Sequence, residues 1–157
     1  NVTGYFDFQG DSNVLDILLN SNGAYSADYA NLNLQVTGGS NIFDIEIAEV
    51  SNADYLDLDW IIDGDNNEFE FDIDYENATN YIDIFGDSNE LTFSGSGYAG
   101  TTSSDSGYFY LDLDGSSNTF NITQSSTLAR DWLKITTNGS NSTFCIVQND
   151  GGTSTTC

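Results

Sequence analysis

Apolar and polar residues alternate along most of the chain, in pairs of short segments that flank a glycine-containing bend. The bend has the pattern Gly-x-x-Asn in five places, which are Gly10 to Asn13, Gly38 to Asn41, Gly64 to Asn67, Gly86 to Asn89 and Gly115 to Asn118. A sixth copy begins at Gly139 and carries Ser142 in place of the asparagine. The glycines are separated by 28, 26, 22, 29 and 24 residues, so repeats of about 26 residues account for the chain.

The residues on either side of each bend follow a period of two when they are counted from the glycine. The positions four and two before it, and five and seven after it, are apolar in 23 of 24 cases, with Thr137 as the exception. This period predicts a strand before and a strand after each bend. The predicted core comprises Phe6, Phe8, Leu15, Ile17, Phe43, Ile45, Phe69, Phe71, Leu91, Phe93, Phe120, Ile122, Phe144 and Ile146.

Two folds accommodate such units. A hairpin at each bend would give an antiparallel sandwich or barrel, whereas a β-arc would let each strand pair with its counterpart in the next repeat. Registered identical side chains favour the arc, because like residues then stack on like, and the inward asparagine amides can bond one another along the stack. We therefore predict an all-β fold, a single parallel β-solenoid of about six strand–arc–strand coils. One domain spans residues 1–157, including a tail at 149–157.

Charge restricts the possible functions. The 157 residues include 25 acidic side chains but only Arg130 and Lys134 as cations and no histidine, for a net charge of −23. Nucleic-acid binding needs a basic surface and is not expected. Membrane insertion is not expected, because no apolar run approaches the roughly 20 residues of a span. Catalysis is also not expected, because the chain lacks histidine and its acids are spread over every repeat.

Many acidic residues stand at outward positions of the predicted strands. They form either a solvated face or sites bridged by cations, above all Ca²⁺, which prefers carboxylate oxygens. No EF-hand loop is present, and no cofactor is required. The candidate metal ligands are Asp7, Asp16, Asp44, Glu70, Asp83 and Asp112.

The two cysteines and the first residue point to an extracellular protein. Cys145 and Cys157 form an even pair, which predicts a disulfide that closes the tail, with a bridge between subunits as the alternative. A sequence that starts at Asn1 rather than Met suggests a signal peptide that has been removed. The expected location is secreted, extracellular or at the cell surface.

Two repeats resemble the curlin repeats of curli fibres. They are YLDLDGSSNTFNITQ at Tyr110–Gln124 and LKITTNGSNSTFCIVQ at Leu133–Gln148, each with a glutamine nine positions after the glycine. The other repeats depart from that family and carry Leu19, Ile47, Ile73 and Gly95 in the glutamine position. The resemblance implies a secreted amyloid-type subunit that stacks end to end into a biofilm-matrix or cell-surface filament.

Two functions are therefore expected as alternatives. In the first, the protein is a homopolymer in which the strand of Phe6 and Phe8 meets that of Leu133 and Ile135 in the next copy. Arg130 and Lys134 would then face acidic residues of that copy, namely Asp7, Asp11 or Asp16. In the second, a monomeric or trimeric solenoid acts as an adhesin or virion-fibre module. It would bind glycans or a host surface through loops 20–31 and 94–107, which carry Tyr25, Tyr29 and Tyr98.

Overall fold

A computed structural model describes residues 2–19, 28–47, 53–73, 75–96, 106–125 and 130–149. This part of the chain is built from strands, and none of its segments is a helix long and apolar enough to cross a membrane. The strands are β1 (Val2–Gln9), β2 (Val14–Leu19), β3 (Ala30–Thr37), β4 (Ile42–Ile47), β5 (Ala53–Asp54), β6 (Leu56–Asp63), β7 (Glu68–Ile73), β8 (Tyr75–Glu76), β9 (Thr79–Phe85), β10 (Glu90–Ser96), β11 (Ser106–Asp114), β12 (Thr119–Ser125), β13 (Arg130–Asn138) and β14 (Thr143–Asn149).

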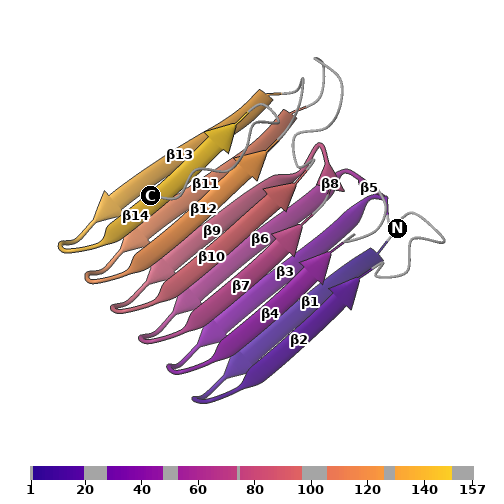
Figure 1. The fold of residues 1–157 in the computed structure, drawn as a ribbon. Coiled ribbons are helices and arrows are strands. Elements are labelled where there is room, and N and C mark those ends of the chain that lie inside the picture. Colours follow the sequence, from indigo (N-terminus) through magenta and orange to yellow (C-terminus); the bar gives the residue numbers. More distant parts are fainter. Residues whose placement is uncertain are drawn as a thin grey trace.

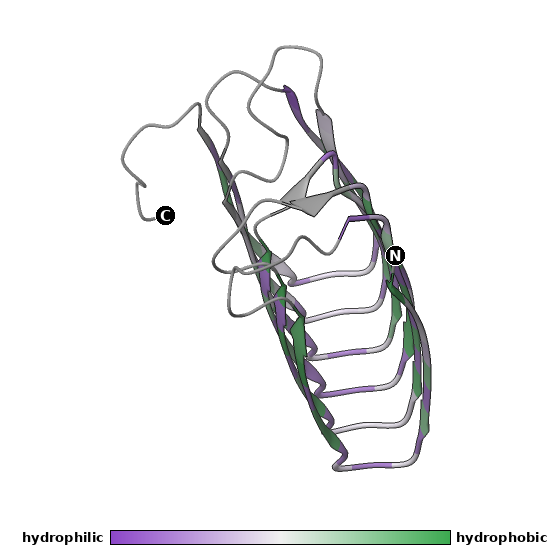
Figure 2. Ribbon diagram, turned by 90° about the vertical axis from the view of Figure 1, so that its right-hand side faces the viewer, coloured by the Kyte–Doolittle hydropathy of each residue, from purple (hydrophilic) through white to green (hydrophobic). Residues whose placement is uncertain are grey.

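The long strands form two parallel sheets of six strands each. Sheet A has the order β1-β3-β6-β9-β11-β13, and sheet B has the order β2-β4-β7-β10-β12-β14. Each repeat gives one strand to each sheet, and the Gly-containing arc joins the two strands (Figure 1). The two sheets face one another with the arcs along one edge (Figure 2). The chain is therefore a parallel β-solenoid, as predicted, and the hairpin alternative is wrong because the strands that flank a bend pair with neighbouring repeats.

The register aligns every repeat on its glycine. Phe43 of β4, for example, pairs with Leu15 of β2 on one side and with Phe69 of β7 on the other. The rings of Phe43 and Phe69 stack with centroids 5.0 Å apart. The predicted inward side chains of the four middle repeats are buried between the sheets, where they form one continuous core.

The arcs stack as closely as the strands. The first glycine of each arc from the second coil to the sixth lies where a Cβ atom would collide with the carbonyl oxygen of the preceding arc glycine; these glycines are Gly38, Gly64, Gly86, Gly115 and Gly139. The residue two positions after each glycine has a positive φ, from 58° at Ser40 and Asn66 to 62° at Ser12 and Ser117. Glycine at the first position and Ser or Asn at the third fit these demands, because glycine lacks Cβ and short polar residues tolerate positive φ.

The arc asparagines form the predicted ladder through the stack. The backbone N–H of Asn41 donates to Oδ1 of Asn67 at 3.0 Å, and its side-chain amide donates to the same oxygen at 2.9 Å. Asn67 donates to Asn89 in the same way, at 2.9 and 3.1 Å. These buried amides are thus satisfied by one another.

Two details differ from the sequence-based prediction. The strands run further into the predicted loops, since β3 begins at Ala30, β10 ends at Ser96 and β11 begins at Ser106. A short parallel pair, β5 with β8, was not predicted.

Candidate assembly surfaces at the two ends of the solenoid

In the first coil, made of β1 and β2, the side chains at core positions are partly exposed to solvent. Phe6, Phe8, Leu15 and Ile17 occupy inward positions, yet they are only partly buried. Their counterparts in the second coil are fully covered, with Phe43 at 1% exposure. The difference arises because β1 and β2 are edge strands, each paired on one side only among the described strands.

The last coil, made of β13 and β14, shows the same exposure at the opposite end. Leu133, Ile135 and Phe144 are partly buried, and Ile146 is 40% exposed. Ile146 therefore does not belong to the buried core as predicted, although it points inward. Burial at this position requires a coil on both sides, and β14 has a described neighbour, β12, on one side only.

The N–H to Oδ1 bonds of the asparagine ladder all run with one polarity, so the first and the last coil end in different groups. At each step the asparagine N–H of one coil donates to the Oδ1 of the next, from Asn13 to Asn41 at 2.8 Å through to Asn118. The last step is weaker, because the N–H of Asn118 donates to Oγ of Ser142 at 3.3 Å. The first coil thus ends in an acceptor, Oδ1 of Asn13, and the last coil ends in donors, the N–H and hydroxyl of Ser142.

The backbone shows the same complementarity. The N–H of the residue after each arc donates to the preceding coil, as in Ile42 to Asn13 O and Thr143 to Asn118 O. By this pattern Val14 presents an N–H and Ser142 presents a carbonyl at opposite ends. A Cβ atom on Gly10 would meet nothing within 4 Å, in contrast to the other five arc glycines. The arc of the first coil therefore has room for another arc stacked on it.

The structure places the predicted contact charges on different surfaces. Lys134 lies on the outer face of sheet A, where it pairs in register with Tyr110, and Arg130 begins the same strand. Asp7 lies on the outer face of the same sheet, in β1. Asp16 is on the outer face of sheet B, and Asp11 lies in an arc, where its carboxylate accepts the N–H of Gly39. Of the three acids, only Asp7 shares a face with Lys134.

Five of the six candidate metal ligands form two separate columns, whereas Asp7 pairs with Gln35. Asp16, Asp44 and Glu70 pair in register on sheet B, while Asp83 pairs with Asp112 on sheet A. Within the described ranges, no three acidic, His or Cys side chains are grouped so as to hold a metal ion. Burial, followed by the charges of Asp112 and Asp59, raises the pKa of the Asp83 carboxyl above its ordinary value.

The remaining predicted residues are partly described. Gln148 donates to Oε1 of Gln124 at 2.8 Å, so the glutamines nine positions after Gly115 and Gly139 bond each other. Tyr29 stacks on Tyr55 with centroids 5.0 Å apart, and both rings are exposed. Cys157, Tyr25 and Tyr98 lie outside the described residues, so the Cys145–Cys157 disulfide stays a prediction.

Comparisons with protein-family models, with curated proteins and with solved structures gave no match to this chain.

Proposed function

We propose that this protein is the structural subunit of a secreted extracellular fibre, in which copies stack head to tail into a continuous cross-β solenoid. The observation that carries the proposal is the complementarity of the two ends. One end offers Oδ1 of Asn13 and the N–H of Val14, and the other offers the N–H and carbonyl of Ser142. The resemblance of Tyr110–Gln124 and Leu133–Gln148 to curlin repeats supports a biofilm-matrix or cell-surface filament of this kind.

At the proposed junction, the last coil of one copy and the first coil of the next pair in the same register as neighbouring coils inside the molecule. Alignment of Gly10 with Gly139 of the next copy places Phe6 beside Ile135, Leu15 beside Phe144 and Ile17 beside Ile146. Partly exposed core residues on both ends then become covered, and both sheets continue without an edge. Strand addition of this kind gains affinity from main-chain hydrogen bonds and specificity from the side chains that alternate between the faces.

A second candidate is a monomeric or trimeric adhesin or virion-fibre module that binds surface glycans. The stacked pair of Tyr29 and Tyr55 favours it, because both residues have positive φ, 59° and 61°, and both rings are exposed. Positive φ is uncommon for bulky residues and clusters at functional positions.

The test for the fibre uses a variant that removes one junction donor. Val14→Pro deletes the N–H that faces away from β4, so the hydrogen bonds between β2 and β4 remain. The Val14 side chain is 72% exposed, so its replacement removes no core contact. Val14→Thr is the matched control, because it changes the side chain but keeps the N–H, and threonine stands at the equivalent positions Thr119 and Thr143.

We expect filaments with a meridional spacing of about 4.8 Å from the unchanged protein and from Val14→Thr, seen by electron microscopy and fibre diffraction. Val14→Pro should remain monomeric and, added in small amounts, should stop filament growth, because its intact last coil can still dock. Monodisperse monomers of the unchanged protein at high concentration and native salt would overturn the proposal.

A further inference from the structure

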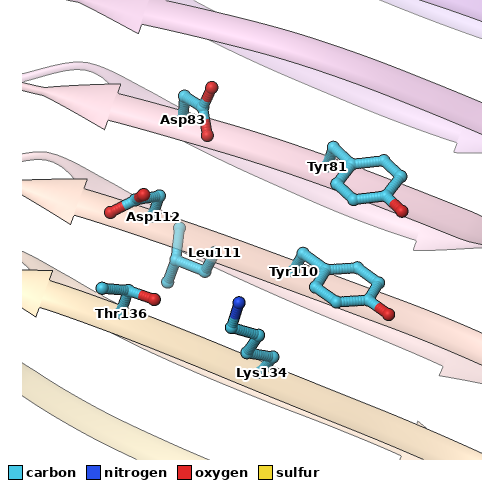
Figure 3. A pocket seen from close by; sticks show the side chains of 7 residues that line it. All are labelled: Tyr81, Asp83, Tyr110, Leu111, Asp112, Lys134 and Thr136. Atoms are coloured by element: carbon cyan, nitrogen blue, oxygen red, sulfur yellow. The ribbon is translucent and has the colours of Figure 1, made fainter.

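A shallow pocket lies on the outer face of sheet A, away from both the core and the arcs. It has a volume of about 160 Å³ and spans β9, β11 and β13. Figure 3 shows the tyrosine rings side by side on neighbouring strands, next to the carboxylates and the lysine. The lining residues are Tyr81, Asp83, Tyr110, Leu111, Asp112, Lys134 and Thr136.

One side of the pocket is an aromatic surface. The rings of Tyr81 and Tyr110 stack at 4.7 Å with planes 11° apart, and Tyr108 lies nearly parallel to Tyr110 at 6.2 Å. Trp132 extends the row by stacking on Tyr108 at 5.9 Å. Tyr81 is 46% exposed and Trp132 is 51% exposed, although large aromatic side chains are normally buried. An exposed apolar row rimmed by polar groups marks a binding surface.

The other side carries hydrogen-bonding groups of both kinds. Asp83 and Asp112 pair in register and offer acceptors, while Lys134 and Thr136 follow on the next strand and offer donors. The two carboxylates repel one another, which contributes to the raised pKa of Asp83. A ligand that donates hydrogen bonds to both carboxylates would relieve this repulsion.

We propose that this pocket binds a saccharide that carries no acidic groups. The Tyr81 and Tyr110 rings cover each other's facing sides by stacking, so a sugar ring packs its C–H groups against their exposed edges. Its hydroxyl groups bond the carboxylates, the lysine and the threonine on the other side of the pocket. The charge of the protein, −23, and the two carboxylates against one lysine disfavour uronic-acid or sulfated chains. The pocket is complete within one molecule, so the inference does not depend on fibre assembly.

The ligand is a saccharide rather than a metal ion or an apolar partner. Among the described residues, no three acidic, His or Cys side chains are grouped so as to hold a metal ion. The row of aromatic rings would also make no contact with a metal ion bound by the carboxylates. An apolar partner would leave Asp83, Asp112 and Lys134 without hydrogen-bond partners, which costs binding free energy.

The test measures oligosaccharide binding by titration calorimetry on the monomeric fraction of the Val14→Pro variant, isolated by size-exclusion chromatography. The probes are cellohexaose, which is neutral, a glucosamine hexamer, which is cationic, and a galacturonate hexamer, which is anionic. Tyr110→Ala removes the central ring, and Asp112→Asn removes one charge without changing the shape of the side chain.

Two control variants make the same chemical changes elsewhere. Tyr5→Ala removes a 68% exposed tyrosine at the equivalent position of β1, and Asp44→Asn removes a carboxylate from the outer face of sheet B. Far-UV circular dichroism and thermal unfolding check that each variant is folded.

We expect the neutral or the cationic probe to bind the unchanged pocket, with the anionic probe weakest. Tyr110→Ala and Asp112→Asn should each lower the affinity about tenfold, and the two controls should leave it unchanged. Three results would overturn the proposal: no binding of the neutral and cationic probes at millimolar concentration, tightest binding of the galacturonate hexamer, or equal losses in pocket and control variants.

Discussion

Replacement of Ser142 by asparagine tests the ladder and the junction together. Ser142 is the one arc position where the Gly-x-x-Asn pattern fails. The bond from the N–H of Asn118 to its hydroxyl is 3.3 Å, compared with 2.7–3.0 Å for the same bond at the other steps. An asparagine side chain is longer, so Ser142→Asn should shorten this bond and supply an acceptor for the side-chain amide of Asn118.

The expected magnitude follows from counting hydrogen bonds. One additional bond within the molecule is worth about 1 kcal/mol, which for a chain of this length raises the midpoint of thermal unfolding by roughly 2–4 °C. At the junction, the new side-chain amide can donate to Oδ1 of Asn13 in the next copy. A further gain of about 1 kcal/mol there corresponds to a roughly fivefold lower critical concentration for assembly.

The assay combines calorimetric unfolding of the monomer with the concentration of soluble protein left at equilibrium with filaments. Ser117→Asn is the matched control, because it makes the same chemical change in an arc but at an exposed position outside the ladder. Asparagine is compatible with that position, since Asn66 occupies it in the third coil with φ of 58°. A rise in the unfolding midpoint without any change in critical concentration would refute the continuation of the ladder across the junction. Unchanged values of both would refute the reasoning about the last step itself.

Three further predictions follow from buried and charged groups. Asn67→Ala leaves the N–H and amide of the buried Asn41 without their acceptor, so chemical denaturation should show a loss of about 2–5 kcal/mol, against little change for the exposed Asn138→Ala. The raised pKa of Asp83 means that the folded state holds the carboxyl proton more tightly than the unfolded state does. The ionised carboxylate therefore destabilises the fold at neutral pH. Protonation removes this penalty as the pH falls through the raised pKa, and the penalty is fully removed below the ordinary pKa of 3.8. Asp83→Asn should therefore stabilise the protein at pH 7, and thermal unfolding should show a weaker pH dependence than for the unchanged protein, whereas an unaltered pH profile would contradict this. Joint replacement of Lys134 and Arg130 by glutamine should slow filament growth in low salt and have less effect in high salt, and equal rates under both conditions would exclude an electrostatic role for these cations.

The inward half of each repeat could be predicted from the sequence because it is set by local rules. Residues four before and seven after Gly64, for example, are Trp60 and Phe71, and the structure places them against one another with ring centroids 4.4 Å apart. The glycine and the asparagine of each arc follow from close stacking and amide pairing, which any solenoid of this register imposes.

Burial at the ends could not be predicted in the same way. Ile146 has the same offset from its glycine as Ile45, yet one is 40% exposed and the other fully buried. A periodic pattern specifies the direction of a side chain, whereas burial also depends on a neighbouring coil. This is why the core prediction fails where the described stack stops.

The aromatic pocket was missed, although its signal is present in the sequence. Tyr81, Tyr110 and Lys134 all stand five positions before their glycines, and Asp83 and Asp112 stand three before. The residues at inward positions are apolar in nearly every repeat and therefore form a recognisable pattern, whereas the residues at outward positions differ from coil to coil. Only the parallel register shows that these residues lie on adjacent strands and line a common pocket.

In the proposed fibre, the outward positions carry the charges that oppose contact between copies, and the inward positions carry the contacts that join them. Two molecules that each carry −23 repel one another at long range, whereas the ladder bonds of the junction act only on contact. Screening shortens the range of repulsion from about 30 Å at 0.01 M salt to about 8 Å at 0.15 M, which is less than the rise of two coils at about 4.8 Å each. Above that salt concentration, repulsion is confined to the coils next to the junction, and the contacts of Phe6, Leu15 and Ser142 decide the outcome. In the proposed fibre, the acidic outer faces therefore set the salt dependence of assembly, and the inner ladder sets its direction and register.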